Sequence, residues 1–196
     1  MKSYFLKTVA VSIFFLLVTY SGNAFAQHSH DHVSATAVSA QDQALRDELK
    51  GKNGKQAMAL ANAWRQKNLD VTTFVTPDAV HFKFMDGQSV TVPMPKDQMV
   101  ISVAPYIQNT HACSTHYMSK CDGELKNVPI KVRAVTAGGK TVINKTIKTP
   151  PTGFFDLWLP RNQEINVTVS AMGKKATGKI LTYRDSKTCD TTLKLE

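Results

Sequence analysis

The stretch that most constrains the fold lies beyond Met99, where short segments rich in β-branched and aromatic residues alternate with turn sequences. These segments read "VISVAPYI", "VPIKVRAVT", "TVINKTIKT", "GFFDLWLP", "EINVTVSAMG", "GKILTYR" and "TTLKLE". Short strands at regular spacing are typical of an all-β sandwich or barrel. The turn "AGGK" also predicts a hairpin between the second and third segments. We therefore predict an all-β C-terminal domain over residues 99–196.

The order of these segments resembles the prealbumin-like sandwiches of bacterial surface and transport proteins. In those proteins a turn and a paired strand are followed by segments like "GFFDLWLP" and "VTV". This likeness implies a prealbumin-like fold for the C-terminal domain and carries no information on activity.

Two helices are predicted before the strands. "SAQDQALRDELK" offers Ser39 as an N-cap with Asp42 three residues on, followed by Leu45 and Leu49 at helical spacing. "GKNG" ends this helix, and the second has an apolar face that reaches Trp64.

Beyond Asp70 the period changes to that of strands, in "VTTFVT", "AVHFKF" and "QSVTVPM". Asp86-Gly87 separates the last two segments, which is a strong hairpin signal. Together with the helices, these strands predict a small α+β domain over residues 39–98. The chain as a whole is then of the α+β class.

The N-terminus has the features of an export signal. Lys2 and Lys7 precede the apolar run "TVAVSIFFLLVTY", and Ala24 and Ala26 stand at the −3 and −1 positions that signal peptidase requires. We expect a signal peptide over residues 1–26, cleaved after Ala26, and a periplasmic mature protein. No second long apolar run follows, so we expect no membrane contact.

The chain is basic, with a formal net charge of +9. Its Lys and Arg residues are scattered and form no dense block, and an exported protein rarely meets nucleic acid. A solvated basic surface is therefore the better interpretation, and we expect no nucleic-acid partner.

The segment "HACSTHYMSKC" concentrates soft metal donors: His111, Cys113, His116, Met118 and Cys121. The remaining cysteine, Cys189, begins the last predicted strand, which could pair beside this loop. Thiolate, imidazole and thioether donors favour Cu(I) or Zn(II) over Mg²⁺ or Ca²⁺. Zinc would take four ligands, such as the three cysteines and His116, whereas Cu(I) needs only two or three sulfurs.

Three readings of the cysteines remain open on these grounds. A structural disulfide is the default for exported cysteines, and an odd count leaves one thiol free. A metal site is favoured by the clustered histidines and methionine. A thiol–disulfide oxidoreductase or isomerase acting on proteins, with Cys121 and Cys189 as its pair, is weakened by the absence of a C-x-x-C motif.

Three segments together, "HACSTHYMSKCDGEL", "TGFFDLWLPRN" and "TCDTTLKL", resemble the CueP family of periplasmic copper-binding proteins. The resemblance extends from the helical segment near Leu45 to the C-terminus. It implies a three-cysteine copper site at Cys113, Cys121 and Cys189, and His116 matches the family's loop histidine as an auxiliary donor. His111 and Met118 are left open as ligands or bystanders.

The resemblance further implies a role in copper resistance, with copper passed to a periplasmic cuproenzyme. It also implies a homodimer formed through residues 39–98. Because two thiols give two electrons on forming a disulfide, a cysteine pair could reduce arriving Cu(II), and a periplasmic thiol reductase would reset it. The predicted tail, residues 27–38, adds His28, His30 and His32 as weak Cu(II) ligands.

Overall fold

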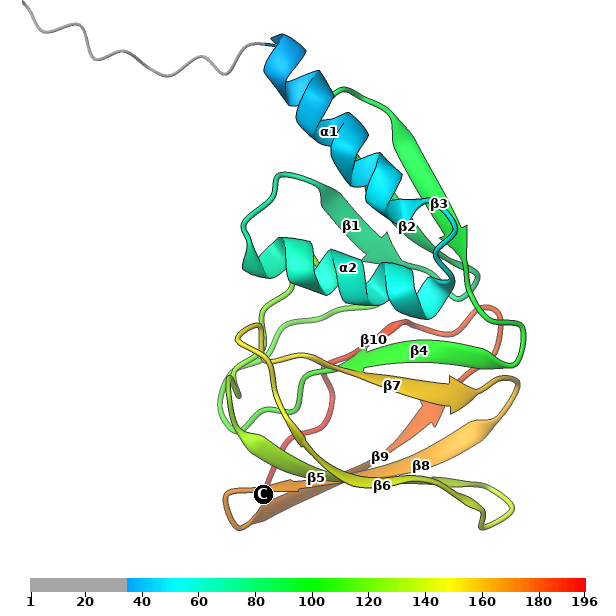
Figure 1. Cartoon of the computed structure of the whole chain (residues 1–196). Coiled ribbons are helices and arrows are strands. Elements are labelled where there is room, and N and C mark those ends of the chain that lie inside the picture. Colours follow the sequence, from blue (N-terminus) through cyan, green and yellow to red (C-terminus); the bar gives the residue numbers. More distant parts are fainter. Residues whose placement is uncertain (1–34) are drawn as a thin grey trace, which may run out of the picture. The chain divides into compact units, whose positions relative to one another are not determined.

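The structure, a computed structural model, describes residues 35–196, which form two helices followed by ten strands (Figure 1). The elements are α1 (Ala35–Leu49), α2 (Gly54–Gln66), β1 (Thr72–Val75), β2 (Ala79–Lys83), β3 (Ser89–Pro93), β4 (Gln98–Val103), β5 (Pro129–Thr136), β6 (Thr141–Lys148), β7 (Phe155–Pro160), β8 (Glu164–Ala171), β9 (Lys174–Leu181) and β10 (Cys189–Asp190). The predicted signal peptide and His28, His30 and His32 lie outside the described residues.

The two helices and the first three strands share one core. Strands β1, β2 and β3 form an antiparallel sheet in that order. Trp64 on α2 packs edge-on against Phe82 on β2, with ring centroids 5.4 Å apart. Asn53 caps α2 by accepting from the Gln56 backbone N–H, and the Gln56 side chain accepts in return, so the helix start is closed by a reciprocal pair.

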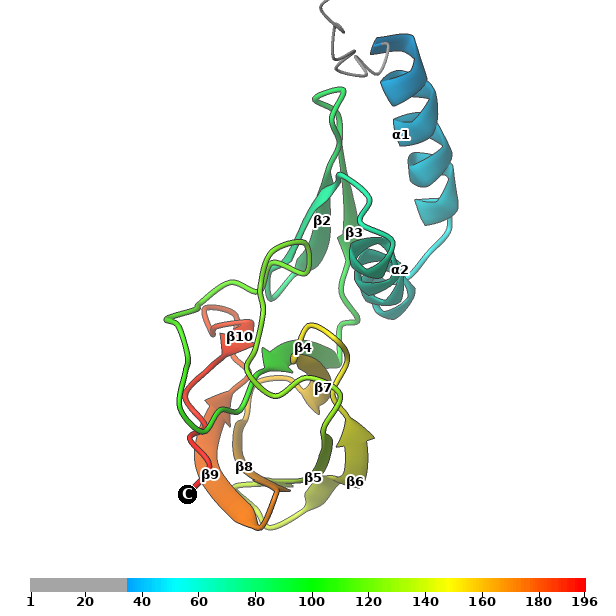
Figure 2. The ribbon, with the colours of Figure 1, turned by 90° about the vertical axis from the view of Figure 1, so that its left-hand side faces the viewer.

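The remaining strands form two further sheets, ordered β10-β4-β7 and β6-β5-β8-β9. Figure 2 shows the ribbons of these two sheets from the side, facing one another, and the layer between them is the core of the sandwich. Buried apolar residues from both sheets fill that layer, among them Ile101, Leu157, Val132 and Val167. The predicted α+β class with a C-terminal sandwich is confirmed.

The predicted start of α1 and the predicted extent of the last strand were wrong in detail. The first helix begins at Ala35, so Ser39 lies inside it, because the preceding alanines are good helix formers. At the C-terminus, β10 has two residues, and Lys194 adds a single bridge to Tyr106. The amide and hydroxyl of Thr192 both donate to the Asp190 carboxylate, which bends the chain after β10.

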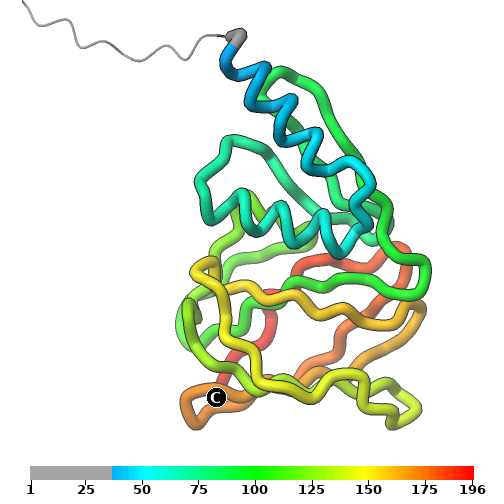
Figure 3. The backbone as a smooth tube through the Cα atoms, in the orientation of Figure 1, coloured from blue at the N-terminus to red at the C-terminus, as the bar shows by residue number. Residues whose placement is uncertain are grey.

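The segment between β4 and β5 returns to the helical part of the chain before entering the sandwich, as the tube in Figure 3 shows. Met118, within this segment, packs into the same core as Trp64 and Val75. The cysteine loop therefore lies where the two cores meet. Within residues 35–196, no helix is long and apolar enough to cross a membrane.

Candidate metal centre

The loop that carries Cys113 and Cys121 is tied to β1 and to the segment before β10. Val75 donates its backbone N–H to the His116 carbonyl at 3.0 Å, and His116 donates its own N–H to the Thr188 hydroxyl at 3.1 Å. That hydroxyl donates to the Val75 carbonyl at 2.7 Å, so one threonine joins both partners. These bonds fix the His116 backbone between the two cores.

A second set of bonds holds Cys189 beside the loop. The carbonyl of Ser114 accepts from the backbone N–H groups of Thr188 (2.9 Å) and Cys189 (3.3 Å). Thr191 donates its hydroxyl to the His111 carbonyl at 2.6 Å. Strand β10 itself pairs with β4 in parallel, with Cys189 opposite Ser102. The expectation that the last strand begins at Cys189 beside the loop is confirmed.

These contacts bring all three cysteines together, although Cys189 is distant in sequence. Cys113 and Cys189 form a disulfide with their Cα atoms 5.7 Å apart. Cys121 is a free thiol whose Sγ lies 3.9 Å from the Cys113 Sγ. The pairing differs from the one considered for an oxidoreductase, because the loop places Cys113, rather than Cys121, against Cys189.

His116 is a buried histidine that lies beside the cysteine sulfurs. Its Nδ1 lies 4.0 Å from the Cys189 Sγ, its ring packs 4.6 Å from that of Phe154, and it is only 3% exposed. Burial, with a smaller contribution from His111, lowers its pKa to about 4. The imidazole is therefore neutral at neutral pH, which is the form that binds a metal.

His111 and Met118 differ from His116 in their surroundings. His111 is exposed, and one of its ring nitrogens lies within 4.8 Å of the Cys113 and Cys121 sulfurs. Met118 is 1% exposed and belongs to the core around Trp64. The second group of donor atoms within 4.8 Å of one another comprises His116, Cys121 and Cys189.

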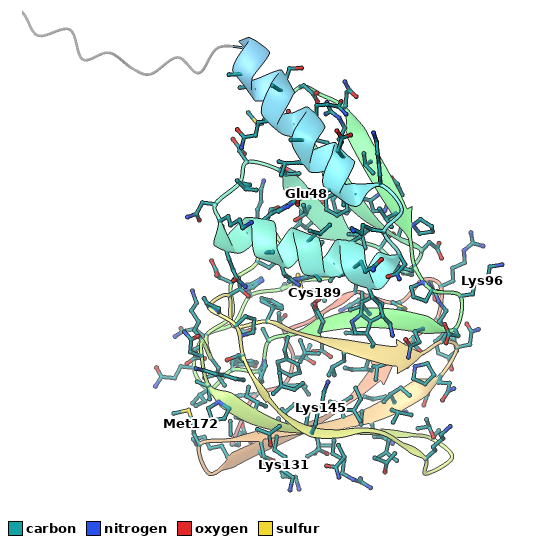
Figure 4. The ribbon with its side chains drawn as sticks, viewed as in Figure 1. Glu48, Lys96, Lys131, Lys145, Met172 and Cys189 are labelled. Atoms are coloured by element: carbon teal, nitrogen blue, oxygen red, sulfur yellow. A yellow bond between two sulfur atoms is a disulfide. The ribbon has the colours of Figure 1, made fainter. Side chains whose placement is uncertain are left out.

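Cys121 belongs to both groups of donors. Burial raises the pKa of its thiol and the nearby Asp122 adds to this, whereas the backbone N–H of Tyr117, 3.4 Å from its Sγ, works in the opposite direction. Figure 4 labels Cys189, the disulfide partner of Cys113, which lies at the level between α2 and β4. Three sulfurs and an imidazole meet at this level, and this soft donor set suits copper.

The sequence of residues 56–194 matches the family described as "CueP: Periplasmic copper-binding protein CueP". The chain belongs to the CueP family. A solved structure described as "Crystal Structure of S.CueP" is 32% identical to this chain, with a TM-score of 0.71, and the match covers 83% of this chain and 99% of that one. No curated protein matches the sequence.

The match to the CueP family confirms the resemblance that the three sequence segments carry. The chain therefore belongs to a family of periplasmic copper-binding proteins. Sequence patterns did not identify the residues that position the site, notably Thr188 and Ser102. Thr188 stands directly before Cys189, and a hydroxyl beside a cysteine is too common to signal a role. Their contribution depends on pairings across the fold.

Proposed function

We propose that the chain binds Cu(I) through Cys113, Cys121 and Cys189, with His116 as an auxiliary donor. The observation that carries this proposal is the position of the Cys121 Sγ, which lies near both the Cys113 sulfur and the His116–Cys189 pair. Thiolates are the ligands that Cu(I) prefers, and all three become available once the disulfide is reduced. Zn(II) is a competing ion in vitro, since the same four side chains can supply tetrahedral ligands.

In its dithiol form, the Cys113–Cys189 pair gives the site a second activity, the reduction of Cu(II). Two thiols that lose two electrons and two protons form one disulfide and convert two Cu(II) ions to two Cu(I) ions. The Cys113–Cys189 bond is the product of that reaction, and a thiol reductase is needed to restore the dithiol. In this proposal Cys121 and His116 remain as donors to copper in the oxidised protein.

The biological role that follows is limitation of periplasmic copper toxicity and supply of copper to a periplasmic cuproenzyme. Export depends on the predicted signal peptide with cleavage after Ala26. A homodimer through residues 39–98 remains our prediction for the assembly. Size-exclusion chromatography with light scattering on the mature chain tests it directly.

An anaerobic titration tests the copper site. The reduced mature protein is titrated with Cu(I) against a chromophoric chelator, as wild type and as each single Cys→Ser variant, with Ser114→Ala as a control from the same loop. We expect one tightly bound copper, weakened by more than about 100-fold in each cysteine variant, since even changes to residues behind the ligands cost 10–100-fold. Failure of the wild type to compete with the chelator would refute the proposal.

A thiol–disulfide oxidoreductase or isomerase is the alternative function, and one observation favours it. A free thiol lies 3.9 Å from a disulfide sulfur, which is the arrangement that precedes thiol–disulfide exchange. Metal-free reduction of insulin, or refolding of scrambled ribonuclease, by the wild type but not by Cys121→Ser would support this alternative. Copper binding without either activity would exclude it.

A further inference from the structure

The positive charge of the chain is concentrated in the segment that builds the β6-β5-β8-β9 sheet. Residues 129–181, from the start of β5 to the end of β9, contain nine Lys and Arg residues and two acidic residues, a formal charge of +7. Residues 35–128, which include both helices and the cysteine loop, contain ten basic and nine acidic residues, a formal charge of +1. The fold therefore gathers on one sheet basic residues that are scattered along the sequence.

Strand alternation directs most of these charges away from the sandwich core. On β5, Val132 is buried in that core, so Lys131 and Arg133 project to the opposite side of the sheet. Lys131 is opposite Ser170 on β8, which is in turn opposite Lys175 on β9. We call the outward-facing residues of β5, β6, β8 and β9 the basic face. Its charged members are Lys131, Arg133, Lys148, Glu164, Lys175 and Lys179.

One end of the basic face is hollowed. A cavity of about 470 Å³ opens beside the β8–β9 turn, and its lining includes Lys131, Lys174, Lys175, Thr146, Ser170 and Met172. None of the described residues that line this hollow is acidic. Figure 4 labels Lys131 and Met172 on the side of the sandwich away from α2. The hollow thus combines three ammonium groups with two hydroxyl groups.

The ion pairs formed within residues 35–196 leave four of these cations without a carboxylate partner: Lys131, Arg133, Lys174 and Lys175. Glu164 is bound to Lys179 at 2.7 Å, and the Glu196 side chain is bound to Lys194 at 3.3 Å. Lys131 and Lys175 are two strands apart, roughly 10 Å, which is close enough for their charges to repel at physiological salt. An anion bound between them would replace this repulsion with attraction.

The uncharged residues of the basic face indicate which kind of anion fits. Asn166, Thr168 and Ser170 of β8 lie between the cations of β5 and β9. Their amide and hydroxyl groups both donate and accept hydrogen bonds, as the hydroxyl groups of a sugar do. Strands β5, β6, β8 and β9 contain no aromatic residue, so the bases of a nucleic acid would find no stacking partner. The exposed large apolar residues near this sheet, Met172 and Leu181, lie at its ends and offer little area to insert into a bilayer.

We propose that the basic face binds an acidic polysaccharide, a sugar chain that carries carboxylate, sulfate or phosphate groups. One acidic group occupies the hollow between Lys131, Lys174 and Lys175, and neighbouring groups along the chain meet the cations of β5 and β9. Cys189 belongs to the other sheet of the sandwich, so a bound polymer leaves the cysteine loop accessible. This binding activity goes beyond the proposed copper function and does not depend on it.

Biolayer interferometry on the mature chain tests the proposal. The protein is titrated over sensors coated with dextran sulfate, polygalacturonate or neutral dextran. We expect saturable binding to at least one of the two acidic polymers and none to neutral dextran. The affinity should fall by at least about tenfold between about 50 and 200 mM salt, because each neutralised acidic group releases condensed counterions.

Two triple variants with the same change in net charge separate the basic face from the overall charge of the protein. Lys131→Gln/Arg133→Gln/Lys175→Gln should weaken binding by at least about tenfold. The control, Lys52→Gln/Lys67→Gln/Lys96→Gln, removes exposed lysines outside this sheet and should weaken binding by less than about twofold.

A further variant tests the hollow itself. Ser170→Glu places a carboxylate among the three lysines of the hollow and should weaken binding by at least about tenfold, whereas Ser170→Ala should retain most of it. Circular dichroism and the urea midpoint establish that each variant is folded, which is expected because the altered side chains face away from the core.

Three results would overturn the proposal. These are the absence of saturable binding to both acidic polymers by the wild type, binding to neutral dextran with equal affinity, and equal losses in the two triple variants. Tighter binding to phosphatidylglycerol vesicles or to duplex DNA than to either polymer would also overturn it, because the partner would then belong to another class. Cu(I) affinity, measured on reduced protein, should be the same in the first triple variant and the wild type. Loss of copper binding by the wild type would therefore refute the proposed function alone.

Discussion

The two faces of the β10-β4-β7 sheet are built from alternate residues of the same strands, yet they differ in chemistry. The inner face contributes Ile101 and Leu157, which are paired with each other and buried in the sandwich core. One residue further along, the outer face contributes the paired Ser102 and Asp156 and, from β10, Cys189. Strand alternation therefore separates a purely apolar surface from a reactive one by the thickness of one sheet.

This difference shows how a rigid site can be built on a short loop. The inner face fixes the strands through apolar packing. The outer face then holds Cys189 where its backbone N–H can donate to a carbonyl of the cysteine loop. Changes to the inner face should alter stability and leave copper chemistry intact. Changes to the outer face should alter copper chemistry and leave stability nearly unchanged, except where they remove the disulfide.

The disulfide is the feature of the outer face with the largest expected effect on stability. Cys113 and Cys189 are separated by 76 residues, and a cross-link of that span removes about 4 kcal/mol of unfolded-state entropy. Reduction should lower the free energy of unfolding by about this amount, measured by urea denaturation with and without a phosphine reductant. Cys121→Ser should show the same loss on reduction, and a change below about 1 kcal/mol would contradict the estimate.

Truncation on the inner face should have the next largest effect. Leu157 is fully buried, so Leu157→Ala should destabilise the fold by about 3 kcal/mol through lost burial and a residual cavity. Urea denaturation measures the loss, and Lys131→Ala on the exposed side of β5 is the control, with a change within about 0.5 kcal/mol. The Cu(I) affinity of folded Leu157→Ala should equal that of the wild type. A weakened affinity would mean that the two faces are coupled.

The two loop histidines provide a smaller and sharper contrast. His116→Ala should weaken Cu(I) binding by about tenfold, because His116 faces the Cys189 sulfur from a buried position. His111→Ala should change it by less than about twofold, since its ring is exposed and solvated. The same chelator competition measures both variants, and equal losses would show that the exposed histidine is also a ligand.

Lowering the pH should weaken the hydrogen bonds that hold the start of the cysteine loop. Burial raises the pKa of Glu124, but the backbone N–H groups of Asn109, Ile107 and Gln108 outweigh it and hold that pKa below the usual range. A carboxyl group with a lowered pKa stabilises the fold above its unfolded pKa, and this contribution is lost as pH falls through the folded value.

The acid effect is the smallest of the four and is measured as the difference in urea midpoint between pH 7 and pH 4. Glu124→Gln keeps the shape of the side chain and lacks its charge, so it should cost less than about 1 kcal/mol at pH 7. Part of the acid sensitivity should disappear in this variant. An identical pH dependence in the variant and the wild type would assign that sensitivity to other carboxylates.

Local patterns were sufficient to predict most elements of this fold. Asp86-Gly87 forms the expected turn, with Gly87 at a φ of 83°, and "AGGK" forms the second with Gly139 at 84°. In both, glycine supplies a backbone conformation that other residues rarely adopt. Residues 191–196 show the limit, because Thr191, Leu193 and Leu195 alternate as a strand does, yet they pair through a single bridge.

The candidate site could be predicted by residue type, but its pairing could not. Cys113, Cys121 and Cys189 were identified from their chemistry and compartment. Which two are bonded depends on the register of β10 against β4 and on the carbonyl of Ser114, neither of which leaves a local signal. Asp156 did leave one, as a single acid within the apolar strand "FDLWLP", although its two hydrogen-bond partners come from other elements, β4 and α2.

Strand β6 affects how readily the protein associates with other copies at high concentration. It forms one edge of the β6-β5-β8-β9 sheet, and edge strands offer unpaired backbone groups to any other chain. Lys145 on β6 is opposite the buried Val132, so it occupies a core-facing position while remaining exposed at the sheet's rim (Figure 4). A strand added from another molecule would enclose its ammonium group. The lysine therefore discourages aggregation through this edge.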